Sequence, residues 1–191
     1  LSDEIIRLLG EGSGKPPLIL KVDESEAAGS LGIRVQSFIE TVELRRAADV
    51  VLVEADGAKR LPLKAPAEYE PVIPPCADAV AAVAGMDAVG QAVGAVCHRP
   101  ERVCALLGAG AEHVLTPEDA ALLLASPQGG RKGVREAMAF RCVLNKADTP
   151  ERSAHASAVA GRLADIDIDA VLATGNIEEY IVPAARTAAR P

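Results

Sequence analysis

The sequence predicts an α/β protein built around a mostly parallel sheet, and two observations carry this prediction. Apolar stretches of strand length alternate along the chain with stretches of helical spacing, which is typical of parallel α/β proteins. Two of the strand-like stretches, at 50–54 and 140–144, run directly into polar motifs. Open parallel sheets carry their ligand sites at the carboxyl ends of such strands. At 191 residues, we expect one domain that spans residues 1–191.

The individual elements follow from apolar spacing and from helix-capping residues. Strands are expected at 18–22, 50–54, 79–84, 140–144 and 170–173. Helices are expected at 2–9, 35–48, 99–107, 116–126, 133–138, 150–163 and 177–181, with a loop at 10–17. Thr116 is expected to cap its helix, because Pro117 follows at the first helical position.

The composition narrows the classes of function. Apolar residues make up 49% of the chain, which is enough for an aliphatic core. The formal net charge of −7 argues against general nucleic-acid binding, which depends on an excess of Lys and Arg. No apolar run approaches the roughly 20 residues that span a bilayer, and no signal peptide is visible, so we expect a cytoplasmic protein with no membrane association. The four cysteines contain no CxxC pair, which predicts reduced and mostly buried thiols.

The acidic end of the strand expected at 50–54 is the first candidate site. The apolar run leads directly to Glu54, Asp56 and Gly57. In P-loop nucleotide-binding proteins a carboxylate at such a place holds Mg²⁺, and the backbone N–H of the glycine lies near the terminal phosphate. We therefore expect Glu54 and Asp56 to be catalytic and magnesium-binding, and Gly57 to contact the nucleotide. The alternative is a strand that simply turns at Asp-Gly, a common turn pair.

The second candidate site is the loop after the strand expected at 140–144. Asn145, Lys146 and Asp148 match the NKxD pattern with which GTPases read guanine. The Asp carboxylate accepts from N1–H and the 2-amino group of the base, while the Lys stem can lie over the ring. Thr174, after the next strand, belongs to a stretch that could supply backbone amides to the same base. An ordinary loop in which Asp148 caps the next helix is the alternative.

A charged segment rich in proline, at 59–75, follows the first site. Prolines fix φ and lower the entropy that a loop loses on ordering, so such a segment can hold charges in place. A loop of this kind suits a substrate or a protein partner better than it suits an incidental connection. The side chains expected to bind there are Lys59, Arg60, Lys64, Glu70, His98 and Arg99. For His98 and Arg99 the alternative is an ordinary helix start before Pro100.

One part of a nucleotide site is missing from the sequence. A phosphate loop requires GxxxxGK[ST], and the similar stretch at 10–16 has Pro16 where the hydroxyl residue belongs. Pro16 and Pro17 also lack the backbone N–H groups that would bind phosphate at a helix start. We interpret this stretch as a linker loop.

The run EADGAKRLPLKAPAEYEPVIPP is similar to the signature of the YqeC family of selenium-dependent hydroxylase accessory proteins. The resemblance extends through CHRPE at 97–101 and TPE at 116–118 to NKAD at 145–148. It implies a three-layer, P-loop NTPase-like fold and binding of GTP or ATP with Mg²⁺. It also implies, as partner, a molybdenum hydroxylase or its cofactor-maturation machinery.

Members of this family would begin with a strand, a glycine-rich phosphate loop and a helix. This chain has no such start, so we expect an N-terminally truncated sequence. The missing strand would leave an open sheet edge, and self-association into a homo-oligomer is a possible consequence.

Two other functions remain open from the sequence. The first is a non-catalytic module that holds a client enzyme or its cofactor with the proline-rich segment. The second is a nucleotide-dependent transferase or kinase that acts on a small acidic substrate bound by Lys59, Arg60 and Lys64. An NTPase activity resembling that of GTPases is conceivable for the full-length protein, and the sequence names no reaction.

Overall fold

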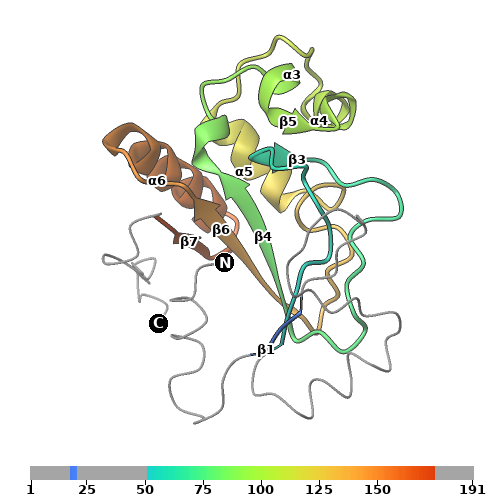
Figure 1. Ribbon diagram of the computed structural model, residues 1–191. Helices are drawn as coiled ribbons and strands as arrows, with labels where there is room; N and C mark the ends of the chain where they lie inside the picture. The colour runs from blue at the N-terminus through green and yellow to red at the C-terminus, as the bar shows by residue number, and fades with distance from the viewer. Residues whose placement is uncertain (1–17, 21–50, 175–191) are drawn as a thin grey trace. The chain divides into compact units, whose positions relative to one another are not determined.

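The computed structural model describes residues 18–20 and 51–174 (Figure 1). The expected helices at 2–9, 35–48 and 177–181 and the loop at 10–17 lie outside these residues. The chain divides into two compact units. Of the described residues, the first unit holds 18–20, 51–57 and 70–77, and the second holds 58–69 and 78–174. A compact unit need not be a separate folding domain, so the expectation of one domain stays a prediction.

The first unit contains two parallel strands, β1 (Leu18–Leu20) and β2 (Val51–Val53). Their register pairs the first residues, Leu18 and Val51, and continues to the third residue of each strand. The residues after β2 are also held by backbone pairing, because Val72 N–H donates to the Ala55 carbonyl at 2.9 Å. Both predicted strands therefore exist within the described residues.

The second unit is built on a parallel sheet of three strands in the order β4-β6-β7. These strands are β4 (Ala79–Gly85), β6 (Ala139–Asn145) and β7 (Ala170–Leu172). Gly85 is paired with Asn145, and Leu144 with Leu172, so the carboxyl ends of all three strands lie at one edge. Every strand pair in the described residues is parallel, as the predicted α/β class requires.

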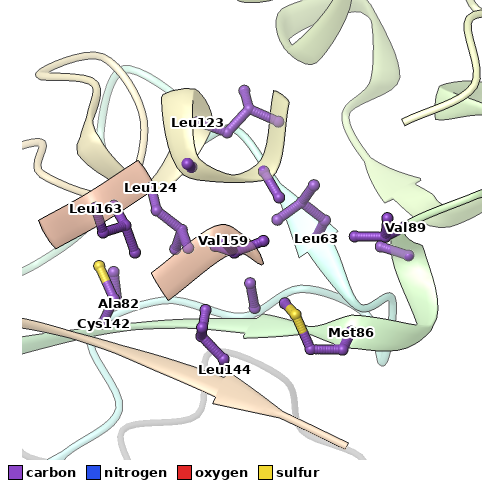
Figure 2. Packing of buried hydrophobic residues seen from close by; sticks show 14 of the residues in the cluster. Leu63, Ala82, Met86, Val89, Leu123, Leu124, Cys142, Leu144, Val159 and Leu163 are labelled. Carbon is purple, nitrogen blue, oxygen red and sulfur yellow. The ribbon is translucent and has the colours of Figure 1, made fainter. Parts of the chain in front are cut away.

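One face of this sheet forms the core of the second unit. Along β6, Phe140, Cys142 and Leu144 are buried while their neighbours are more exposed, which is the period of two expected for a sheet covered on one face. Helices α5 (Pro117–Ala125) and α6 (Pro150–Ala164) pack together against this face. Figure 2 shows their side chains meeting those of the strands. The main contributors are Ala82, Leu123, Leu124, Cys142, Leu144, Val159 and Leu163.

The ends of both core helices follow capping rules. Thr116 caps α5, accepting from Asp119 N–H while the Asp119 side chain accepts from Thr116 N–H, which forms a capping box. Thr149 caps α6 by accepting from Arg152 N–H at 3.2 Å, and Pro150 follows at the first helical position. These caps explain why the boundaries of both helices could be predicted within about two residues.

The expected helix at 133–138 is wrong. The stretch forms turns instead, with Gly133 at φ +74° and Met138 N–H bonded to the Arg135 carbonyl. A positive φ at Gly133 lies outside the right-handed helical region, so the expected helix cannot begin at this residue.

Four short elements were not predicted. They are β3 (Leu63–Lys64), the 3₁₀ helix η1 (Met86–Ala88), α3 (Val93–Val96) and β5 (Cys97–His98). Next to them, α4 (Pro100–Leu107) begins one residue later than expected. In Figure 1, β3 and β5 lie together near α3 and α4. Leu63 of β3 belongs to the core, so this short strand is anchored by a buried side chain (Figure 2).

Candidate functional site

The NKxD residues form the loop that connects β6 to α6, at the carboxyl edge of the sheet. Asn145 is the last residue of β6 and is exposed, and Asp148 is also exposed. The α6 cap is Thr149, so the alternative in which Asp148 acts as the cap is wrong. The loop also has a buried anchor, since Ala147 is 5% exposed and belongs to the core cluster.

Backbone hydrogen bonds join this loop to the residues that follow β7. Ala147 N–H donates to the Ala173 carbonyl at 3.0 Å, and Ala173 N–H donates to the Leu144 carbonyl at 2.9 Å. The half-buried Thr174 is the next residue. The predicted base-reading residues Asn145, Asp148 and Thr174 therefore come from two loops that lie side by side.

Lys146 makes a contact that the sequence did not suggest. Its Nζ lies 2.6 Å from Oδ2 of Asp87, which belongs to η1 directly after β4. The Lys146 side chain is 42% exposed and that of Asp87 is 24% exposed, so the pair is partly shielded from water. Lys146 also has φ +61°, in the left-handed region that non-glycine residues seldom adopt. The ion pair thus links the carboxyl ends of β4 and β6.

Gly85, the last residue of β4, meets the charged segment at this edge. Its N–H donates to the Pro62 carbonyl at 2.8 Å. A Cβ on Gly85 would lie 2.7 Å from Pro62 Cβ and 2.4 Å from Asp87 Oδ1, so only glycine fits. The beginning of the charged segment is consequently fixed beside the end of β4, which η1 and its Asp87 follow directly.

Lys59 and Arg60 occupy a tight turn just before Pro62. Leu61 N–H donates to the Ala58 carbonyl at 2.9 Å, and the two central residues have φ +50° and +64°. Both angles are positive, as in the primed turns that normally use Asn and Gly. Two exposed cationic residues in this conformation carry backbone strain of the kind often found at functional sites.

The short strands β3 and β5 bring together three of the predicted binding residues. Lys64 is the register partner of His98, so both lie at the same position of a parallel pair. Arg99 follows with φ +59° and precedes α4. Its guanidinium lies 6.0 Å from the centre of the Tyr69 ring and 3.5 Å from the Tyr69 hydroxyl. Its Nη1 is also 3.4 Å from His98 Nδ1.

Two further cations hold the backbone of the same segment. Arg102 donates to the Pro66 carbonyl at 3.3 Å, and Lys132 Nζ donates to the carbonyls of Ala67 and Glu68. Tyr69, at the end of this stretch, is 68% exposed. Sequence reasoning did not predict the contacts of Tyr69, Arg102, Lys132 and Asp87. No local pattern identifies them, because each acts on residues at least 30 positions away.

The acidic candidate residues belong to the first unit. Glu54 and Gly57 are exposed and Asp56 is half-buried, all directly after β2. Glu70 is in the same unit and is only 9% exposed, whereas Lys59, Arg60 and Lys64 are in the second unit. The described residues contain no group of three or more His, Cys, Asp or Glu side chains able to hold a metal ion. Mg²⁺ needs only one or two protein carboxylates when it also binds phosphate oxygens and water, so the magnesium-binding role expected of Glu54 and Asp56 stays a prediction.

None of the four cysteines forms a disulfide, in agreement with the prediction of reduced thiols. Burial raises the pKa of Cys97 to about 11, helped by the nearby Cys104, and burial alone raises the pKa of Cys142 to about 12. Both thiols are therefore protonated at neutral pH and poorly suited to bind a metal or to act as nucleophiles.

Comparisons with known proteins agree with the resemblance noted in the sequence. The family model described as "YqeC protein" matches residues 14–101. The "Uncharacterized protein YqeC" of Escherichia coli (strain K12) is 32% identical over 158 residues, which is 80% of this chain and 61% of the relative. This chain thus spans less than two thirds of the length of that relative. No solved structure matches, and no helix in the described residues is long and apolar enough to cross a membrane. On the family model and this relative together, the chain belongs to the YqeC family.

Proposed function

We propose that this protein is a nucleotide-binding accessory protein that prefers guanine nucleotides. The observation that carries the proposal is the position of the NKxD loop. It follows β6 at the carboxyl edge of the sheet, and Ala147 N–H bonds it to the loop after β7. Two adjacent loops at this edge are where open parallel sheets bind their ligands. The P-loop NTPase character of the fold is part of the same proposal.

The expected specificity comes from hydrogen-bond complementarity. In guanine, N1–H and the 2-amino group are both donors, and the ionised carboxylate of Asp148 offers two acceptor oxygens. Adenine has no donor at either of these positions, so its binding would leave the carboxylate without partners. A site built on charged hydrogen bonds can therefore reject the wrong base strongly.

The magnesium part of the proposal concerns the first unit. Glu54 and Asp56, directly after β2, would hold Mg²⁺ together with phosphate oxygens, and Gly57 would give its backbone amide to the nucleotide. Bound Mg²⁺ neutralises phosphate charge and is what would make an NTPase activity possible.

The proposed partner is a selenium-dependent molybdenum hydroxylase, or the machinery that matures its cofactor, in the cytoplasm. This part follows from the resemblance of the signature run at 54–75. The charged segment supports it as a recognition element, since it is held from α4 and from Lys132 while its Tyr69 is exposed. Exposed Tyr and Arg side chains are common anchors of protein interfaces. Self-association into a homo-oligomer is a further expectation of the same proposal.

The test is a titration with GTP and ATP, each with Mg²⁺, of this chain and of an N-terminally extended version. The Asp148→Ala variant is expected to lose several kcal/mol of preference for GTP over ATP, because a charged hydrogen bond is removed. Asp169→Asn is a suitable control, since Asp169, directly before β7, pairs with Arg141 of β6 and both side chains are about half exposed. Unchanged discrimination in Asp148→Ala would refute the base-reading role.

One observation favours a second candidate, a transferase or kinase that acts on a small acidic substrate. The register of β3 and β5 places Lys64 beside His98, and Arg99 follows directly, so several potential anion-binding groups come together. Turnover of nucleotide that requires an added small acid would favour this function. Nucleotide binding without any such requirement, together with capture of a hydroxylase, would favour the accessory role.

A further inference from the structure

The contact between Lys146 and Asp87 gives the proposed base-reading loop a support that the NKxD pattern does not include. Only one oxygen of Asp87, Oδ2, lies against Lys146, at 2.6 Å. The other oxygen, Oδ1, is buried and has no hydrogen-bond partner among the described residues. A shielded carboxylate of this kind depends on its one cation, because removing the cation would leave the charge uncompensated.

The position of Asp87 is itself fixed by backbone packing. The absent side chain of Gly85 makes room for Oδ1, which would lie 2.4 Å from a Cβ there. Gly85 in turn is fixed by its place in β4 and by its N–H bond to the Pro62 carbonyl. Asp87 is therefore a rigid acceptor that approaches the NKxD loop from the neighbouring strand.

Lys146 needs such an acceptor because its backbone is unfavourable. A non-glycine residue at φ +61° is strained and persists only when surrounding contacts enforce this conformation. The neighbouring contacts of the loop are the Asn145 side chain, which accepts from Lys146 N–H at 2.9 Å, and the buried Ala147. The ion pair is the contact that ties the Lys146 side chain to another strand.

We propose that Asp87 is a positioning residue for nucleotide specificity: by holding Lys146, it fixes the loop that presents Asn145 and Asp148 to the base. The inference rests on the proposed nucleotide binding. Asp87 does not touch the base in this account. It restricts the loop to one conformation before the nucleotide arrives, and preorganisation of this kind increases discrimination between similar ligands.

The first arm of the test needs no nucleotide. Hydrogen exchange at the Ala147 amide reports whether the loop stays bonded to Ala173. Asp87→Asn keeps the shape beside Gly85 and removes the charge, and it should speed this exchange by about tenfold or more. Asp87→Glu should restore much of the protection, and the surface variant Asp169→Asn should leave it unchanged.

The second arm measures dissociation constants for GTP and ATP with the same variants. Asp87→Asn should lower the GTP-over-ATP ratio by about fivefold or more, with Asp87→Glu intermediate. Lys146→Asn is an independent variant that tolerates the left-handed backbone but lacks the cation. It should lower the ratio at least as much as Asp87→Asn does, because the Lys stem expected over the ring is lost as well. The double variant should be no worse than Lys146→Asn alone, since the Lys146–Asp87 contact is already absent there.

The outcomes separate this inference from the proposed function. If the wild type discriminates GTP from ATP and Asp87→Asn does so equally well, the positioning role is refuted and nucleotide binding stands. Unchanged exchange at Ala147 in Asp87→Asn would also refute it. If the wild type shows no GTP preference while Ala147 exchange still responds, the proposed function fails, and Asp87 is a structural support without a role in specificity.

Discussion

The NKxD loop at 145–148 and the part of the charged segment in the second unit, at 59–69, lie in the same region but are held in place by different kinds of contact. The loop follows a seven-residue strand, precedes a fifteen-residue helix and is bonded to the backbone after β7. The charged segment contains one strand of two residues, and it is held by Gly85, Arg102 and Lys132 from distant parts of the chain. A site on regular elements is rigid from the outset, whereas a segment held by scattered contacts is easier to displace.

The two cysteines on strands β5 and β6 allow this difference to be measured. At pH 8, raising a thiol pKa from 9.0 to about 11, as burial does for Cys97, lowers the thiolate fraction about a hundredfold. For Cys142, at about 12, the factor is about a thousandfold. In a timed alkylation read by mass spectrometry, the half-buried Cys76 and Cys104 should react first and Cys142 last. If Cys142 reacted before Cys97, the comparison of the two regions would be wrong.

Substitution of Gly85 should damage the junction between the two regions. Gly85→Ala places a Cβ within 2.7 Å of Pro62 Cβ, and overpacking of this kind costs about 1–3 kcal/mol in the free energy of unfolding. Chemical denaturation followed by circular dichroism measures this change. The matched control is Gly161→Ala in α6, where a Cβ meets nothing within 4 Å.

The control should shift stability in the opposite direction. Ala is favoured over Gly inside a helix by about 1 kcal/mol, so Gly161→Ala is expected to stabilise the protein. Equal effects of the two substitutions would contradict the close packing described at Gly85.

The N-terminal cap of α5 is formed by residues that lie close together in the sequence, and its contribution to stability can be measured separately. Burial by itself raises the pKa of Asp119, but hydrogen bonds from Thr116 and from His113, at 2.8 Å, outweigh it and leave this pKa below its ordinary value. A carboxyl whose folded pKa is lowered stabilises the protein above its unfolded pKa, and this stability is lost as the pH falls through the folded pKa.

The wild type should therefore lose more stability than Asp119→Asn between about pH 5 and pH 2. Urea denaturation of both proteins across this range provides the measurement. Parallel pH curves for the two proteins would show that the Asp119 contacts contribute nothing to the cap.

Much of the fold was predictable because its signals are local. Apolar runs predicted β2, β4, β6 and β7. The Thr-Pro pairs at 116–117 and 149–150 predicted where α5 and α6 begin. The two-residue strands β3 and β5 were not predictable, since so short a strand exists only through its partner. The helix expected at 133–138 is absent because Gly133 adopts a positive φ, which apolar spacing does not reveal.

The candidate site likewise contains residues that local patterns reveal and residues that only tertiary contacts bring together. Asn145 and Asp148 were found from a four-residue pattern, and Lys64, His98 and Arg99 from charge in a proline-rich context. Asp87 could not be found, since it lies 59 positions from Lys146 and only the pairing of β4 with β6 brings the two together. The sequence also grouped Glu70 with Lys59 and Lys64, because these residues lie close together along the chain. The structure assigns Glu70 to the first unit and the two lysines to the second.

The most direct test of the central claim is a designed change of base specificity at Asp148. In xanthine a carbonyl oxygen replaces the 2-amino group of guanine, so the NH₂ of an Asn side chain can donate to this oxygen while its carbonyl oxygen accepts from N1–H. If Asp148 reads guanine, Asp148→Asn in the N-terminally extended protein should bind GTP about tenfold or more weakly and XTP correspondingly more tightly. Calorimetric titration of both nucleotides with Mg²⁺ decides the matter. An unaltered order of affinities, with GTP still preferred over XTP as in the wild type, would contradict the account.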